Sequence, residues 1–266
     1  MKVIKIILII ALTLLAFTSC EDLEQTVDYE LPYEEKIVID GEIPAGNTGI
    51  SVLVTKTIPP LEEVTFNKVN ITDAEVKLYF ENEVINLEYT DRLSVSSYKS
   101  DGRIEIKPGV EYRLEVKWKG KTAIARTTIP EIPEIKSVTS ENVTEYGWTR
   151  TLYNFEFQPD EKGVLSFRDD IQYYEEKAHL FNDVNRKYNV KIENFNVIND
   201  RDSVFAITYY DVNYYNYYTT RFQGDSEGGV FSSGGLNIEG NVEGDDGIGL
   251  WIGSNSRLDT ISKYIR

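Results

Sequence analysis

The 266-residue sequence contains one cysteine, one histidine and only 28 basic residues against 44 acidic ones. The single cysteine, Cys20, excludes a disulfide within the chain. The single histidine, His179, excludes His-rich zinc sites and leaves one candidate for a His-dependent catalytic triad. The net charge of -16 argues against nucleic-acid binding, which needs lysine and arginine to displace counterions from phosphates. We therefore expect no nucleic-acid partner.

The first 19 residues have the pattern of a signal peptide. Lys2 and Lys5 precede an apolar run over residues 6–17, which is too short to cross a bilayer comfortably. Residues 18–20 (Thr-Ser-Cys) then resemble the lipobox of bacterial lipoproteins, although Phe17 stands where leucine is commonest. The alternative is an ordinary secretory signal with an incidental cysteine. We expect cleavage before Cys20 and lipid on Cys20, which would attach the chain to a membrane.

Residues 20–32 are predicted to form a lipidated acidic tether. Glu21, Asp22 and Glu24 crowd the expected anchor, and the segment shows little periodicity. Acidic residues just after a lipidated cysteine resemble the export signal that sends Bacteroidota-type lipoproteins to the outer face of the outer membrane. A solvated linker is the alternative. We expect outer-membrane localisation, with the protein facing the cell surface.

From residue 33 to residue 130 the hydrophobic pattern has a period of two, which predicts antiparallel strands with one wet face. The clearest case is Glu111–Trp118, where apolar and charged residues alternate strictly. Glycine-containing turn signals separate such runs, as at Lys119-Gly120. Short strands punctuated in this way indicate a β-sandwich of immunoglobulin or transthyretin type.

Two prolines in residues 130–134 mark a domain boundary, because they fix the backbone and remove hydrogen-bond donors. We take residues 131–134 as the connector and residues 135–266 as a second, β-rich domain with one or two short helices. Its strands are predicted near 135–143, 149–157, 188–198 and 203–209. Residues 169–183 are ambiguous between a short helix and an excursion between strands. The predicted fold class is therefore mostly all-β.

A tyrosine-rich stretch, residues 209–222, is predicted to form a short helix rather than a strand. Asp211 could cap it, and Gly224 would follow its end. On such a helix Tyr214, Tyr217, Tyr218 and Phe222 form one stripe, which a buried helix face would turn toward the core. Tyr215 falls outside the stripe and is left as the free ring. The glycine-rich tail that follows is expected to alternate short strands with tight turns.

Several of these segments resemble one known family. Residues 36–43 (KIVIDGEI), the Gly120-Lys121 pair before a strand ending in Ile129-Pro130, and the ending NIEG…DGIGLWIG at residues 237–253 carry the resemblance, with the lipobox. The chain is similar to an uncharacterised Bacteroidota outer-membrane lipoprotein family, a domain of unknown function often encoded beside TonB-dependent receptors. The resemblance implies an outer-membrane location and a receptor neighbour, and it supplies no catalytic residues.

The residues themselves favour a binding protein over an enzyme. His179 has no sequence-adjacent nucleophile, and no phosphate-binding loop is present. Residues 243–247 could offer oxygens to Ca²⁺ but lack the spacing of an EF-hand loop, so we expect a plain turn there. We predict no catalytic residues, no metal and no cofactor. The expected function is a binding or accessory module that works with a TonB-dependent receptor. The alternatives are a structural or adhesive envelope protein and, third, a surface hydrolase.

Aromatic residues are the candidates for contact with a ligand, which could be a glycan or another nutrient, or with a partner. Tyr210, Tyr215 and Trp251 offer large rings whose polar edges tolerate water. The alternative is that about half of such rings face the core and the rest merely cover it.

Overall fold

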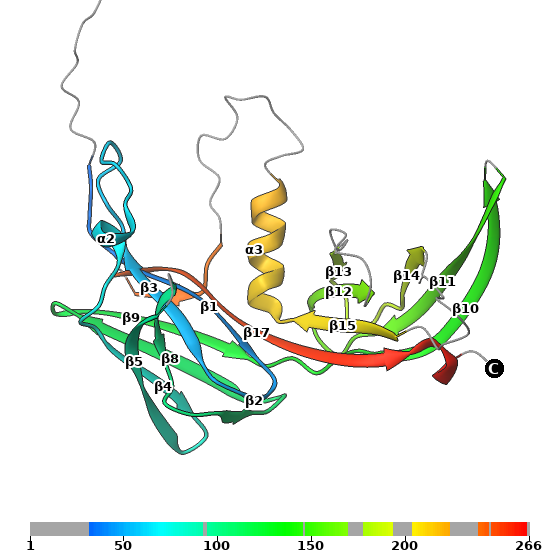
Figure 1. The fold of residues 1–266 in the computed structure, drawn as a ribbon, viewed down its shortest axis with the longest axis horizontal. Coiled ribbons are helices and arrows are strands. Elements are labelled where there is room, and N and C mark those ends of the chain that lie inside the picture. Colours follow the sequence, from blue (N-terminus) through cyan, green and yellow to red (C-terminus); the bar gives the residue numbers. More distant parts are fainter. Residues whose placement is uncertain are drawn as a thin grey trace, which may run out of the picture. The chain divides into compact units, whose positions relative to one another are not determined.

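The computed structural model describes residues 32–92, 95–145, 147–169, 178–193, 204–223, 239–244 and 246–264. The chain divides into two compact units, residues 1–33 and 34–266, and every element described below belongs to the second. Strands dominate it, which confirms the predicted mostly β fold (Figure 1). The predicted signal peptide, Cys20 and nearly all of the predicted tether lie outside the described residues.

One large curled sheet holds twelve of the described strands. In spatial order they are β13 (His179–Phe181), β12 (Gly163–Asp169), β15 (Val204–Tyr210), β17 (Gly247–Thr260), β1 (Ile37–Pro44), β3 (Ser51–Lys56), β6 (Val95–Lys99), β5 (Glu83–Arg92), β4 (Glu75–Phe80), β8 (Glu111–Trp118), β9 (Lys121–Thr128) and β16 (Val242–Glu243).

Two smaller sheets and three helical segments complete the described elements. They are the sheet of β10 (Glu134–Glu145), β11 (Trp148–Gln158) and β14 (Tyr188–Glu193), the pair β2 (Gly46–Thr48) and β7 (Ile104–Ile106), the helices α2 (Phe66–Val69) and α3 (Val212–Gln223), and the 3-10 turn η1 (Ile261–Lys263). Neither α-helix has the length and hydropathy that crossing a bilayer requires.

The alternation that predicted β8 is confirmed in detail. Tyr112, Leu114 and Val116 are buried along one face, and Trp118 ends the same row. The predicted turn joins β8 to β9 because Lys119 and Gly120 both adopt positive φ, at 47° and 79°. This face belongs to a core cluster of buried residues from β1, β3, β4, β8 and β9, to which Trp251 of β17 also contributes.

A second core cluster is built largely from phenylalanine rings. Phe155 of β11 lies 5.1 Å from Phe167 of β12 and 5.3 Å from Phe205 of β15, between ring centroids. The strands predicted at 135–143, 149–157 and 203–209 are present as β10, β11 and β15. The strand predicted at 188–198 begins as β14, and its last five residues lie outside the described residues, as do residues 170–177.

β1 and β17, the first and last of the described strands in sequence order, are neighbours in the large sheet. β1 pairs in parallel with β17, in a register that runs from Ile37↔Gly247 to Pro44↔Ser254. The expectation of short strands and tight turns in the tail is therefore wrong for residues 247–260, which form one 14-residue strand. Gly249 is not a turn residue: a Cβ there would lie 2.0 Å from the carbonyl oxygen of Ile39, so glycine permits close strand contact. Residues 224–238 of the tail are outside the described residues.

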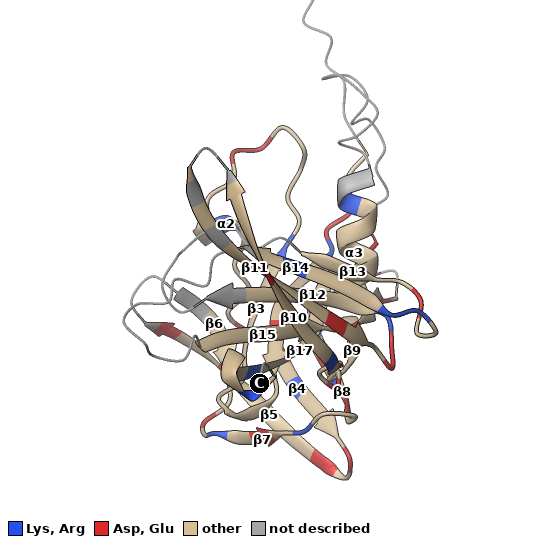
Figure 2. Ribbon diagram, turned by 90° about the vertical axis from the view of Figure 1, so that its right-hand side faces the viewer, with Lys and Arg blue, Asp and Glu red and all other residues tan. Residues whose placement is uncertain are grey.

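Basic and acidic residues are interspersed over the described strands and loops (Figure 2). Lys187, for example, pairs with Glu156 at 2.7 Å, and Lys191 lies 3.8 Å from Glu141. This mixed distribution differs from the continuous basic surface that binds nucleic-acid backbones.

Candidate functional site

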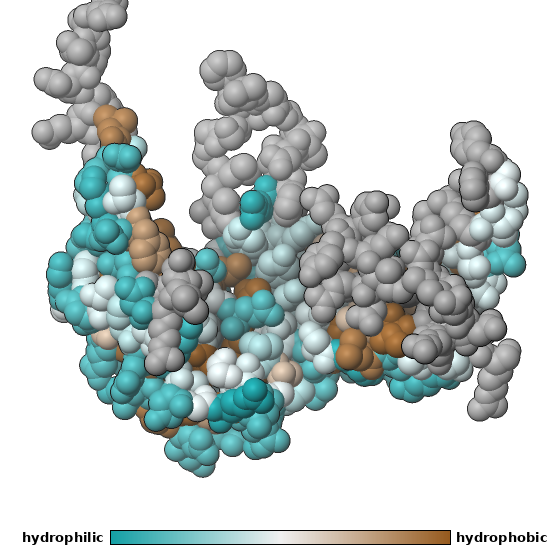
Figure 3. Space-filling model, in the orientation of Figure 1, coloured by the Kyte–Doolittle hydropathy of each residue, from teal (hydrophilic) through white to brown (hydrophobic). Residues whose placement is uncertain are grey.

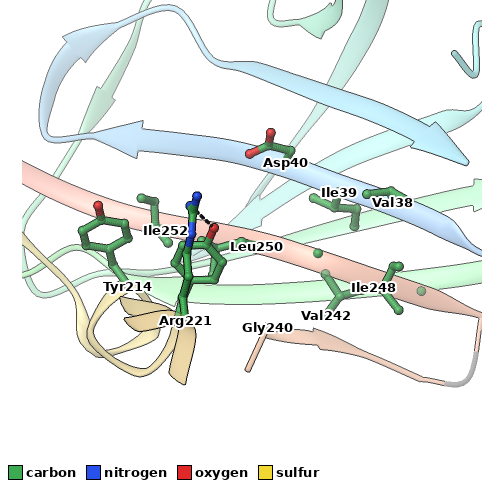
Figure 4. A pocket seen from close by; sticks show the side chains of 13 residues that line it. Val38, Ile39, Asp40, Tyr214, Arg221, Gly240, Val242, Ile248, Leu250 and Ile252 are labelled. Carbon is green, nitrogen blue, oxygen red and sulfur yellow. Dashed lines mark hydrogen bonds between the residues drawn. The ribbon is translucent and has the colours of Figure 1, made fainter. Parts of the chain in front are cut away.

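A groove of about 790 Å³ follows the outer face of the β1–β17 pair, beside helix α3 (Figure 4). The two strands form its floor, α3 forms one wall, and residues 240–242 form the other. The groove therefore combines segments from both ends of the sequence. β1 and β17 lie in the middle of the large sheet, and the groove is lined by side chains of both strands together with Gly247 and Gly249 of β17.

The floor is apolar because both strands alternate. On β1, Ile37 and Ile39 are fully buried in the core, so Val38 between them points to the opposite face. The parallel register places Val38 beside Ile248 and Asp40 beside Leu250. Ile248 keeps 43% of its surface exposed, which is unusual for isoleucine in a central strand. An apolar strip, with Asp40 at its rim, thus lies open to a ligand.

The helical wall presents two tyrosines and an arginine. Tyr214, Tyr217 and Arg221 are spaced by three and four residues, so they share one face of α3. The rings of Tyr214 and Tyr217 stack with centroids 6.2 Å apart and an angle of 25°. Arg221 Nη1 donates to the Tyr217 hydroxyl at 2.8 Å, and its guanidinium lies 5.7 Å from the centre of that ring. Figure 4 shows the side chains of Tyr214 and Arg221 turned toward the floor.

Asp211 fixes the start of this wall, as the sequence predicted. Its Oδ1 accepts the backbone N–H of Tyr214 at 3.0 Å, which is the bond of a helix N-cap. Its Oδ2 accepts the Thr127 hydroxyl of β9 and, at 2.8 Å, the Asn213 amide. Its own N–H donates to the Gly253 carbonyl of β17 at 3.0 Å. Through its side chain and its backbone, this one residue therefore joins α3 to two strands.

Asp211 is almost completely buried, and this burial raises the pKa of its carboxyl above the ordinary value. The hydrogen bonds that the carboxylate accepts from Thr127, Asn213 and the Tyr214 N–H act in the opposite direction, because they favour the charged form. Burial dominates, so the charged form is costly at this position.

The second wall is held by an asparagine that imitates a backbone. Asn241 Oδ1 accepts the backbone N–H of Trp251 at 2.8 Å, and Asn241 Nδ2 donates to the backbone carbonyl of Trp251 at 2.6 Å. The same Nδ2 also donates to the Arg126 carbonyl at 2.8 Å. Gly240 and Val242, on either side, are thereby positioned along the groove.

A family model described as "Domain of unknown function (DUF4249)" matches residues 21–258. The chain belongs to this family. The matched region includes both floor strands up to Leu258 and the whole of α3, so the groove lies inside the family domain. A search of curated proteins found no match.

Within this DUF4249 domain the three predicted contact residues lie close to the groove but do not line it. Trp251 is fully buried, and its ring belongs to the core cluster of the first strands, as the alternative expectation had it. Tyr210 ends β15 half-buried, with its ring 4.7 Å from that of Tyr214. Tyr215 is half-buried on α3. Of the predicted stripe, Tyr214 and Tyr217 form the groove wall.

The floor residues were missed at the sequence level, although a signal was present. At residues 37–39 the run Ile-Val-Ile is apolar on both faces of a strand, and Ile248, Leu250 and Ile252 alternate with glycines and Trp251. A strand that is apolar on both faces is normally covered on both. Here only part of the outer face is covered by α3, and the remainder is the groove floor.

The lining of the groove offers hydrogen bonding and ring stacking. Its polar groups are a carboxylate at the rim, two phenols and a guanidinium, which hydrogen-bond and stack. His179 lies in β13, at the edge of the sheet and away from the groove strands. Within the part of the chain that the structure describes, no group of three or more His, Cys, Asp or Glu residues could hold a metal ion.

Proposed function

We propose that this protein is a non-catalytic binding module that captures a nutrient at the cell surface and works with a TonB-dependent receptor. The observation that carries the proposal is the groove, whose apolar floor is bordered by stacked tyrosines and an arginine. Its volume of about 790 Å³ falls within the range of ligand sites, which is about 300–1,000 Å³.

The chemistry of the groove favours a glycan or a similarly amphipathic nutrient. Tyrosine rings pack against the apolar faces of such molecules, and their hydroxyls tolerate water. Asp40 at the rim can accept hydrogen bonds from hydroxyl groups, and Arg221 can donate them. A ligand lying along β1 and β17 would therefore meet apolar and polar groups together.

The location is proposed from the sequence. Cys20 at the end of a signal-peptide pattern supports a lipid anchor, and the acidic residues after it support export to the outer face of the outer membrane. We also propose that residues 33–130 form an immunoglobulin- or transthyretin-like sandwich, on the evidence of their alternating strands. In this arrangement the lipid holds the binding domain beside its receptor.

The test compares two leucines of the same strand. The intact lipoprotein is purified in detergent as wild type, as Leu250→Lys in the groove floor, and as Leu258→Lys, a control that is 71% exposed outside the groove. Binding to a panel of glycans, co-purification of a receptor from solubilised outer membranes, and thermal melting are measured. We expect Leu250→Lys to weaken ligand binding at least about tenfold, equivalent to about 1.4 kcal/mol. The melting temperature of Leu250→Lys should equal that of the wild type, and the control Leu258→Lys should match the wild type in both binding and melting.

Equal ligand binding by the two variants would show that the ligand site is not in the groove. If the wild-type lipoprotein retained neither a glycan nor a receptor, the binding proposal would be wrong, and the structural or adhesive alternative would replace it.

A further inference from the structure

The loop between β3 and β4 exposes an unusual set of apolar side chains. This segment, residues 57–70, is here called the apolar loop. Leu61 is 84% exposed, Val64 72% and Phe66 48%, and the short helix α2 within the loop has no buried residue. Isolated exposed leucines are common on protein surfaces, but three large apolar residues within six positions indicate a contact surface. Figure 3 shows hydrophobic residues gathered in the region that Figure 1 labels α2.

The apolar loop is fastened at both ends, so its side chains are presented by a defined structure. At its start the Thr57 N–H donates to the Lys36 carbonyl at 3.0 Å. At its end the Asn70 amide donates to the Tyr89 hydroxyl at 2.8 Å, and residue 70 forms a β-bridge with Thr55.

The base of the apolar loop lies where the chain enters the folded unit. The Thr57 hydroxyl donates to the carbonyl of Glu34, the first residue of that unit, at 3.1 Å. Cys20, the proposed lipid attachment site, is 14 residues earlier in the sequence (34 − 20). A segment of that length spans at most about 50 Å when fully extended. A lipid on Cys20 would therefore keep the apolar loop within reach of the bilayer.

We propose that the apolar loop is a membrane-contact element, in which Leu61, Val64 and Phe66 lie in the interfacial region of a zwitterionic bilayer. The inference rests on the lipid anchor of the proposed function. Because the anchor makes the contact intramolecular, a weak insertion suffices to orient the domain.

The composition of the apolar loop favours lipid over protein as the partner. Protein interfaces are enriched in tyrosine, tryptophan, phenylalanine, methionine and arginine, and of these residues 57–70 contain only Phe66. Glu62 is paired with Lys68 at 3.0 Å, so Glu63 is the main source of negative charge. That residual charge, together with the acidity of the whole chain, disfavours anionic headgroups and accounts for the zwitterionic preference.

Because Cys20 is the one cysteine in the sequence, a second cysteine introduced by substitution can be labelled selectively. In the mature lipoprotein the sulfur of Cys20 is blocked by lipid, so Leu61→Cys supplies one free thiol for a polarity-sensitive fluorophore. Leu258→Cys is the matched control, since both leucines are highly exposed. Each labelled lipoprotein is added to phosphatidylcholine vesicles, recovered by flotation, and examined for a blue shift and for quenching by nitroxide-labelled lipid.

We expect both variants to float, and only the label at residue 61 to shift to the blue and be quenched. Val64→Cys should behave like Leu61→Cys, which guards against a local folding defect. Flotation without quenching at either loop position would overturn the membrane contact while leaving the anchor intact. Failure to float would refute the anchor and the contact with it. A shift seen in native outer-membrane fragments but not in lipid vesicles would identify protein docking and overturn the proposal.

Discussion

Gly41 and Trp251 lie directly opposite each other in the parallel pair β1–β17, and the indole covers the glycine. A Cβ at residue 41 would lie 2.8 Å from Cζ3 and 2.9 Å from Cε3 of Trp251. Trp251 is fully buried, so its ring has little room to withdraw. This contact packs the last strand of the chain onto the first.

Gly41→Ala is expected to destabilise the protein by about 1–3 kcal/mol, because the added methyl group overpacks the core. Trp251→Phe should partly relieve the clash because the phenyl ring is smaller than the indole. It loses no hydrogen bond, since Trp251 Nε1 makes none within the described structure. The double variant should therefore lose less than the sum of the single losses, with a coupling of about 1 kcal/mol. Urea unfolding measures all three variants, and Gly102→Ala, at an open position, is the control. Strictly additive losses would contradict the contact.

Asp211→Ala is expected to lower the free energy of unfolding by about 2 kcal/mol or more. The substitution removes the N-cap of α3, worth about 1 kcal/mol, and leaves the buried Thr127 hydroxyl and the half-buried Asn213 amide without this acceptor. Asp40→Ala, which removes an exposed carboxylate, should have little effect. The measurement is denaturant unfolding followed by circular dichroism, and equal stability of the two variants would show that the cap contributes nothing.

Glu115 predicts a dependence of stability on pH. Its carboxylate accepts hydrogen bonds from Lys117 and Arg113, at N–O distances of 2.8 and 2.7 Å, which lower its pKa to about 2. A carboxyl with a depressed folded-state pKa stabilises the fold above its unfolded pKa of about 4.3, and this contribution is lost progressively as the pH falls from there through the folded-state pKa. Glu115→Gln should therefore cost about 1 kcal/mol at pH 7, after allowance for solvent screening.

The difference between Glu115→Gln and wild type should shrink as the pH falls from about 5 and should disappear only below pH 2, the folded-state pKa. Chemical unfolding at a series of pH values measures it, with the exposed Glu88→Gln as control. A difference that stayed constant over this range would mean that the ion pairs of Glu115 add nothing to stability.

The sequence predicted what depends on local pattern. Alternation in β8 and the Asp211 cap of α3 need only neighbouring residues to be recognised, and both are found where they were predicted. The parallel pairing of Ile37 with Gly247 has no such signal, because partners 210 residues apart are selected by packing of the whole core. The glycine-rich tail was expected to alternate short strands with tight turns, whereas the structure uses Gly249 and Gly253 for close contact between strands.

The groove was predictable only in part for the same reason. The tyrosine-rich helix was expected, but its aromatic face was assigned to the core, since a helix with one apolar stripe normally buries it. Tyr214 and Tyr217 instead border an open floor that forms only when β17 returns to β1. A site composed of two distant segments depends on topology, which residue types alone do not specify.

The pairing of β17 with β1 also predicts that residues 34–134 do not fold cooperatively without β17. A fragment of residues 34–134 has β1 as an unpaired edge and lacks Trp251, so we expect it to show no cooperative unfolding transition. Adding a synthetic peptide of residues 239–258 should restore that transition by supplying the missing strand and ring. The same peptide with Trp251→Ala should fail or bind far more weakly. Differential scanning calorimetry of the three samples decides the matter, because cooperative melting of the fragment alone would show that the last strand is dispensable for the first core.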